Sequence, residues 1–169
     1  MDTQIKDIKG WRVTEWGMNK NHLQSLFKDE IDILEVPEEK GRNRICELCI
    51  KNFKINNEIF NIYFVTRKDN GELVQTILKL VDNDGVDFEA GFFHLERLLT
   101  LKYGKSHYEY NSRISSYRHW LFPSTLIMLD YVKPFEVSIR KVEGLYLIYS
   151  DFEYSKKMDN SIYKGLDLV

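Results

Sequence analysis

Alanine, proline and cysteine are scarce in this chain of 169 residues, and it has no long apolar run. Ala90 is the only alanine, and there are three prolines and two cysteines. No stretch approaches the roughly 20 apolar residues that span a bilayer. The first ten residues are polar and lack the apolar segment of a secretory signal. As given, the sequence predicts a cytoplasmic protein, or an exported one whose leader has been removed, and two cysteines fit either compartment.

Neither sign of charge is in excess. Lys and Arg number 24 against 26 Asp and Glu, which gives a formal net charge of -2. Such a balance creates no long-range field that would gather nucleic acid or anionic lipid, so it disfavours nucleic acid as the main partner. Apolar residues make up 43% and aromatic residues 14% of the chain. That is enough for one core without disulfides or metal, and the length predicts a single domain over residues 1–169.

Two helices are predicted from their caps and their apolar spacing. Asn19 is a good N-cap for a short amphipathic helix over about residues 19–28. Asp87 caps a second helix, which ends at Gly104, a natural residue after a helix C-terminus. The apolar face of this second helix consists of Phe88, Phe92, Leu95, Leu99 and Tyr103.

Runs of branched and aromatic residues predict an antiparallel sheet of about six to seven strands. Asn56-Asn57, residues 69–71 and Glu143-Gly144 suit tight turns between them. Pro37 is expected to end a strand and Pro134 to begin one. The candidate strand segments are 11–16, 31–36, 44–55, 58–67, 73–81, 124–132, 135–142 and 145–150.

The order of these elements is helix then strands, twice over. We therefore expect an α+β fold with two helices packed on the sheet, in an αβββ-αβββ-like order. The two possible halves are residues 11–81 and 84–150, and no residue-level repeat relates them. The segment after residue 150 is expected to be a short helix or an ordered tail.

Two segments carry a resemblance to a known family. The first is Trp16-Gly17-Met18 before a capped helix, and the second is Lys102-Tyr103-Gly104-Lys105, followed by Trp120, residues 125–129 and the aromatic-ended strand 147–149. This pattern resembles a family of mostly uncharacterised, often exported bacterial proteins. The resemblance implies the element order of the β-lactamase-inhibitor-protein-like fold and a binding function, and it brings no catalytic residues. The chain departs from the pattern in Asn19, where a Ser or Thr cap is usual, and in lacking an export signal.

Cys46 and Cys49 form a CxxC motif, which is also found in zinc half-sites and redox pairs. Zinc needs four ligands, and the sequence has no second CxxC or closely spaced histidine pair. A redox CxxC usually opens a helix, whereas this one lies in a predicted strand. Strand geometry sends positions i and i+3 to opposite faces. We therefore expect two structural thiols that are buried or half-buried.

Two other patterns have simpler explanations than catalysis or metal binding. His94 and Glu96 diverge by about 200° around a helix, so they do not act together. Asp82, Asp84 and Asp87 lack the glycine and glutamate spacing of a calcium loop, and a turn with a helix cap accounts for them. The sequence therefore predicts no catalytic residue, no cofactor and no metal site.

Residues 105–120 are predicted to form a polar, tyrosine-rich loop. Aromatic and arginine side chains of this kind are typical of protein-interface hot spots, and they also stack on single-stranded bases. Alternatively, the tyrosines of a packed loop fold back onto the sheet. The candidate binding residues are Tyr108, Tyr110, Arg113, Tyr117, Arg118 and Trp120.

The leading hypothesis is a non-enzymatic binding module whose partner is another protein. Its contact surface is either the sheet face or the 105–120 loop, and the loop version requires Tyr110, Arg113 and Tyr117 to be exposed. A second hypothesis is an enzyme with a pocket near this loop, formed by His107, Glu109 and His119. A third is a nucleic-acid-binding protein that uses the same loop.

Overall fold

The computed structural model of the chain describes residues 7–41, 43–83, 85–137 and 140–158. These residues form an α+β fold with an eight-stranded antiparallel sheet, one strand more than the upper expectation. The elements are α1 (Lys20–Phe27), a 3-10 turn (Lys28–Glu30), β1 (Asp32–Glu39), β2 (Arg44–Ile55), β3 (Glu58–Arg67), β4 (Leu73–Leu80), α2 (Phe88–Tyr103), β5 (Tyr108–Asn111), β6 (Ser115–Leu121), β7 (Thr125–Val137), β8 (Arg140–Asp151) and α3 (Phe152–Met158).

One continuous sheet joins the two halves of the described chain. The strand order is β1-β2-β3-β4-β8-β7-β6-β5, and every neighbouring pair is antiparallel. Each half is a helix followed by four strands, so the predicted order of helix then strands is confirmed with one more strand per half. The halves meet at β4 and β8, where Ile77 pairs with Ile148. This central pair brings together residues that are about seventy positions apart.

The caps set the helix limits as predicted. The Asn19 side chain accepts a hydrogen bond from the His22 amide at 3.1 Å, and α1 begins one residue later. The Asp87 side chain accepts one from the Ala90 amide at 2.9 Å at the start of α2. Gly104 ends α2 with a φ of 84°, a conformation that a side chain would strain. Asp84 lies outside the described residues.

The N-terminal segment 11–16 forms turns, so the strand predicted there is wrong. The Trp11 amide donates to the Thr14 hydroxyl at 2.9 Å, and that hydroxyl donates to the Trp11 carbonyl at 2.8 Å. This closed turn aims the indole of Trp11 into the core, against Phe27 and Phe64. The aromatic residues of the segment therefore serve packing across elements, which a local strand pattern does not distinguish.

Both prolines that were expected at strand ends lie inside strands. Pro37 is within β1, an edge strand, and Pro134 is within β7. The pairing register shifts around each of them, and an edge or a bulge tolerates the missing amide donor. Gly144, predicted in a turn, lies within β8 opposite Val132. The predicted strands 124–132 and 135–142 are consequently divided differently, because residues 125–137 form the single strand β7 and residues 140–142 begin β8.

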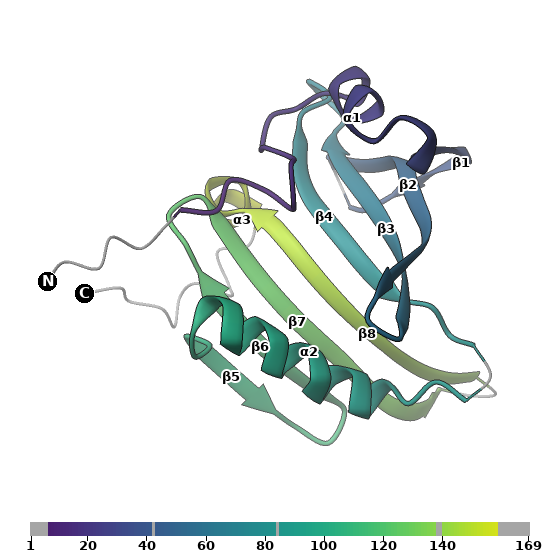
Figure 1. Ribbon diagram of the computed structural model, residues 1–169, viewed down its shortest axis with the longest axis vertical. Coiled ribbons are helices and arrows are strands. Elements are labelled where there is room, and N and C mark those ends of the chain that lie inside the picture. The colour runs from purple at the N-terminus through teal and green to yellow at the C-terminus, as the bar shows by residue number, and fades with distance from the viewer. Residues whose placement is uncertain (1–6, 42, 84, 138–139, 159–169) are drawn as a thin grey trace, which may run out of the picture.

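Helices α1 and α2 pack on the same face of the sheet, which we call the helix face. The ring of Phe27 in α1 lies 5.2 Å from that of Phe64, and Phe92 in α2 lies 5.9 Å from Tyr131. Figure 1 shows α2 lying along the strands of the second half, where it packs over β7 and β8. At Gly91 an added Cβ would approach the Leu145 side chain to 3.1 Å, so this glycine lets α2 lie close to the sheet.

The opposite face, which we call the open face, carries the other half of the strand side chains. At one end of the sheet α3 follows β8, and Tyr154 of this helix lies beside Arg67 of β3. None of the helices in the described part of the chain has the length and apolarity that crossing a membrane requires.

Candidate functional site

Residues 108–111 and 115–121 form a β-hairpin, so the prediction of a 105–120 loop is wrong. Strand β5 pairs with β6 through Tyr108 opposite His119 and Tyr110 opposite Tyr117. The Ser112 hydroxyl closes the turn by accepting from the Ser115 amide at 3.0 Å. The alternation that builds this hairpin is between tyrosine and polar residues, and without an apolar face it has the composition of a loop.

The hairpin divides the six candidate binding residues between the two faces of the sheet. Tyr108 and Tyr110 lie on the open face with 41% and 43% of their surface exposed, and Tyr117 lies half-buried beside them. Arg113 is exposed at the turn of the hairpin. Two candidates, Arg118 and Trp120, have the opposite strand parity and point to the helix face. The exposure that the binding hypothesis required is present for Tyr110 and Arg113 and partial for Tyr117.

Arg118 is 6% exposed and belongs to the interior, so its assignment as a binding residue is corrected. Its guanidinium donates to the carboxylate of Glu96 in α2 and to the Asn111 side chain, and it lies 5.2 Å from the ring centroid of Phe92. A buried guanidinium needs such partners because an unpaired one is costly. Arg118 therefore ties α2 to the hairpin.

Trp120 is also corrected, because it is fully buried under α2. Its indole nitrogen donates to the carbonyl oxygen of Gly104 at 2.8 Å. That carbonyl ends the last turn of α2, where backbone acceptors have no partner within the helix. Trp120 is thus a core residue and a helix C-terminal cap. Of the six candidate binding residues, the three tyrosines are the ones whose side chains lie on the open face.

Near-parallel aromatic rings lie side by side on the open face of this hairpin. Tyr110 and Tyr117 have ring centroids 4.7 Å apart with 24° between their planes. Tyr117 and His119 are 5.1 Å apart at 24°, and Tyr108 and Tyr117 are 5.8 Å apart at 23°. We call Tyr108, Tyr110, Tyr117 and His119 the aromatic stack. Rings held in this way make a rigid surface of apolar area with polar edges.

The aromatic stack is one end of two rows of side chains that cross the open face. Strand register places directly paired residues next to one another on one face. The first row, half-buried over most of its length, is Cys49, Tyr63, Ile77, Ile148, Met128, His119 and Tyr108. The second row is Asn61, Lys79, Tyr146, Asp130, Tyr117 and Tyr110. With six strand intervals of about 4.8 Å, the first row is roughly 29 Å long.

Two titratable groups of these rows are displaced from their ordinary pKa by burial. Desolvation raises the pKa of the Asp130 carboxyl from 3.8 to about 6 and lowers the pKa of His119 from 6.5 to about 4. The His119 Nε2 and Asp130 Oδ1 atoms are 4.0 Å apart, too far for a hydrogen bond. Burial therefore disfavours the charged form of both groups, and neither neutralises the other.

The three residues proposed for an enzyme pocket do not converge. His119 is on the open face, whereas Glu109 pairs in register with Arg118 and therefore faces the other way. The Glu109 carboxylate accepts from the Ser106 hydroxyl, and the ring of His107 accepts from the backbone amide of Leu121. These contacts are local and structural, so they offer no shared acid-base site.

Cys46 and Cys49 lie on the same face of β2, contrary to the expectation of opposite faces. Cys46 pairs with Val65 and Cys49 with Tyr63, because the register shifts between Cys46 and Leu48. Such a bulge inserts one residue and reverses the parity that follows it. Both thiols are free and buried, as predicted, and burial raises the pKa of Cys46 to about 12 and that of Cys49 above its ordinary value. Within the described residues, no group of three or more His, Cys, Asp or Glu side chains is placed to hold a metal ion.

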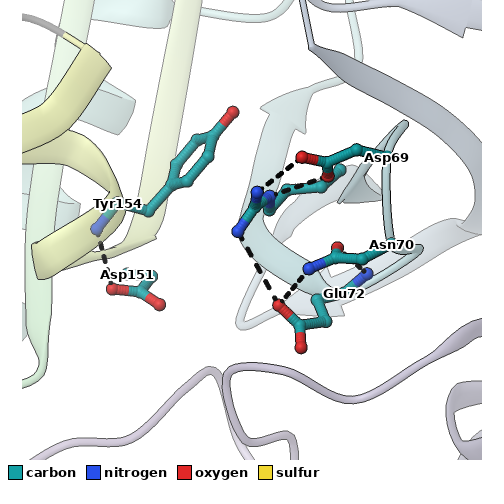
Figure 2. A network of polar contacts seen from close by, with 6 residues as sticks. Asp69, Asn70, Glu72, Asp151 and Tyr154 are labelled. Carbon is teal, nitrogen blue, oxygen red and sulfur yellow. Dashed lines mark hydrogen bonds and ion pairs between the residues drawn. The ribbon is translucent and has the colours of Figure 1, made fainter.

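The structure brings together one polar cluster at the end of the sheet near α3. Arg67 donates to both carboxylate oxygens of Asp69 at 2.9 and 2.6 Å. Figure 2 shows Asp69, Asn70 and Glu72 on the turn after β3, across from Tyr154 and Asp151. A cavity of about 380 Å³ adjoins them. The Arg67 charge is already matched by Asp69, so this cluster closes a turn and packs α3.

A second polar cluster, between His94, Glu58 and Asn56, was not predicted from the sequence. His94 Nδ1 lies 2.7 Å from a carboxylate oxygen of Glu58, and its Nε2 lies 3.2 Å from the Asn56 side-chain nitrogen. The pair adjoins a cavity of about 410 Å³ at the start of α2. No local sequence pattern predicts this contact, because Glu58 and His94 are on different elements. It ties the β2–β3 turn to α2.

Comparison of the chain with protein-family models, curated proteins and solved structures finds no match. The resemblance noted from the sequence therefore stays a prediction.

Proposed function

We propose that this protein is a non-enzymatic binding module that holds another protein against its open face, with the aromatic stack as one end of the contact surface. The observation that carries the proposal is the pair of rows across this face. They combine exposed tyrosine rings with half-buried apolar side chains, while α1 and α2 cover the other face. A binding role is also what the family resemblance implies.

The dimensions and residue types of the face support a protein partner. A standard protein interface covers about 800 Å² on each side, and a surface roughly 29 Å long is of that scale. Tyrosine is enriched in interface hot spots because it brings large area, rigid rings and a hydroxyl. In the first row Ile77, Ile148 and Met128 add an apolar centre. Such a centre with a polar rim is the usual anatomy of an interface.

Two competing functions receive less support from the same residues. A nucleic-acid surface needs cations aligned with phosphates, but the aromatic stack has Asp130 as its charged neighbour and Arg113 only at the hairpin turn. An enzyme near the hairpin would need convergent acid-base groups, and Glu109 and His119 lie on opposite faces. The salt dependence of binding distinguishes a nucleic-acid partner from a protein partner, because binding through phosphates weakens steeply with added salt.

Photo-crosslinking tests the proposal directly. Tyr110 is replaced by the similarly shaped photoreactive residue p-benzoylphenylalanine, and the variant is irradiated in lysate of the source cells. The matched control carries the same residue at Phe93, which is 56% exposed on α2. We expect a discrete protein adduct from position 110 only.

The partner identified in this adduct is then bound, in purified form, to Tyr110→Ser and to Leu101→Ser, a control that is 76% exposed on α2. Loss of affinity in the first variant alone supports the open face as the contact surface. Equal adducts from positions 110 and 93, no adduct from either, or equal loss in both serine variants contradicts it.

A further inference from the structure

Asp130 is an under-satisfied carboxylate in the middle of the second row. It pairs in register with Tyr117 on one side and Tyr146 on the other. One of its oxygens, Oδ1, is buried and has no hydrogen-bond partner among the described residues. An ionised carboxylate only accepts hydrogen bonds, and a buried acceptor without a donor is costly. The side chain as a whole still keeps 37% of its surface exposed, so a ligand on the open face can reach the part of the carboxylate other than Oδ1.

No cation of the described chain neutralises this carboxylate. His119 on β6 is neutral when Asp130 is ionised, because burial lowers its pKa to about 4. Lys133 on β7 donates to the Ser112 carbonyl at 2.8 Å instead. Lys79 on β4 pairs with Tyr146, which separates it from Asp130 by two strand intervals, or about 10 Å. The charge on Asp130 is thus available to a cation from outside the protein.

The aromatic stack beside Asp130 selects the kind of cation. Tyr117 is its direct neighbour, and the outer ring, Tyr110, is 43% exposed. A guanidinium group is planar, so it lies parallel to a tyrosine ring while its N–H groups point in the plane toward a carboxylate. An ammonium group is compact and more strongly hydrated, and a quaternary ammonium has no N–H to donate.

We propose that the open face binds an arginine side chain of the partner protein, with its guanidinium against the ring of Tyr117, the direct neighbour of Asp130, and its N–H groups donating to Asp130. This inference rests on the proposed binding function and names the chemistry of the partner. The site is made by four strands of the second half, since β5 and β6 supply rings, β7 the carboxylate and β8 the flanking Tyr146.

Two short peptides that differ in one residue test the inference. One carries arginine and the other citrulline, which has the same shape without the charge. Each is titrated into the full chain labelled with ¹⁵N, and the amide resonances of Tyr110, Tyr117 and Asp130 are followed. We expect the arginine peptide to shift these resonances and the citrulline peptide to bind at least about tenfold more weakly, because charge-assisted hydrogen bonds are about twice as strong as neutral ones.

Substitution and pH identify the residue that recognises the charge. Asp130→Asn should reduce the affinity for the arginine peptide to that for citrulline, while Glu109→Gln, on the other face of the same hairpin, should leave it unchanged. Because the pKa of Asp130 is about 6, lowering the pH from about 7.5 to about 5 should weaken arginine binding roughly tenfold.

Equal binding of the two peptides, absence of these shifts, or full affinity in Asp130→Asn overturns the arginine site. The crosslinking experiment decides the proposed function separately. An adduct at position 110 whose yield is unchanged in Asp130→Asn leaves a protein-binding face that does not use arginine.

Discussion

Replacing Arg118 by alanine tests the division of the hairpin into a structural and a binding side. The wild-type guanidinium is buried and holds Glu96, the Asn111 side chain and the Tyr117 carbonyl, the last at 3.0 Å. Removing one partner of a buried ion pair costs about 3–5 kcal/mol. The Glu96 side chain keeps 25% of its surface exposed, so water recovers part of that loss.

We therefore expect Arg118→Ala to lower the free energy of unfolding by about 3 kcal/mol, a factor of roughly 150 in the equilibrium constant. For a domain of this size the melting temperature should fall by about 6–12 °C. Urea unfolding followed by circular dichroism measures the first quantity and thermal unfolding the second. Arg113→Ala is the matched control, because this exposed arginine at the hairpin turn should change stability by less than about 0.5 kcal/mol.

A loss of less than about 1 kcal/mol of unfolding free energy in Arg118→Ala, or equal stability of the two alanine variants, would contradict this structural role of Arg118. A binding measurement gives an independent check. Once the partner is known, a folded Arg118→Lys variant should keep its affinity, because the side chain at this position does not reach the open face.

Four further outcomes follow from buried or constrained groups. The free energy of unfolding of Asp130→Asn minus that of wild type should rise between about pH 4 and pH 6, because a carboxyl whose folded pKa lies above 3.8 makes wild type lose stability as pH rises through that window. For His119→Gln the same difference should fall as pH rises, because the folded pKa of His119 lies below 6.5. Urea titrations at several pH values measure both differences. Gly10→Ala should destabilise by about 2 kcal/mol or more in chemical unfolding, because its Cβ would stand 2.1 Å from the Thr14 carbonyl oxygen. The Cys46 thiol, fully buried with a pKa of about 12, should react with a disulfide reagent only at the rate of unfolding, and fast labelling in native buffer would contradict its position.

Local signals predicted the helices and the first meander well. Asp87 and Gly104 gave the limits of α2 because capping depends on residues within one turn. The Asn56-Asn57 turn also formed as predicted, with Asn56 at a φ of 53°. Local signals failed where an expected breaker is tolerated by its surroundings. Pro134 is accommodated by a register shift in β7, and such a shift depends on the neighbouring strand.

The candidate binding residues show most clearly how far a site can be predicted from sequence alone. The sequence composition placed Tyr110, Tyr117, Arg118 and Trp120 on one predicted surface, and in the structure only the two tyrosines lie together on the open face. Alternation along β6 then sends Tyr117 to the open face and Arg118 to the helix face, a division that follows only once the segment is known to be a strand. The burial of Arg118 further requires Glu96, which is supplied by α2.

By itself, the sequence determined the α+β class, the repeated order of helix then strands, the limits of the two capped helices, the Asn56-Asn57 turn and the presence of a tyrosine-rich segment, because each of these depends on residues close together in the chain. The tertiary structure alone decided that β4 and β8 join the halves into one sheet, that a bulge places Cys46 and Cys49 on one face, and that Asp130 lies beside the aromatic stack. Each of these depends on the pairing of strands that are distant in sequence, and that pairing is set by the packing of the whole core.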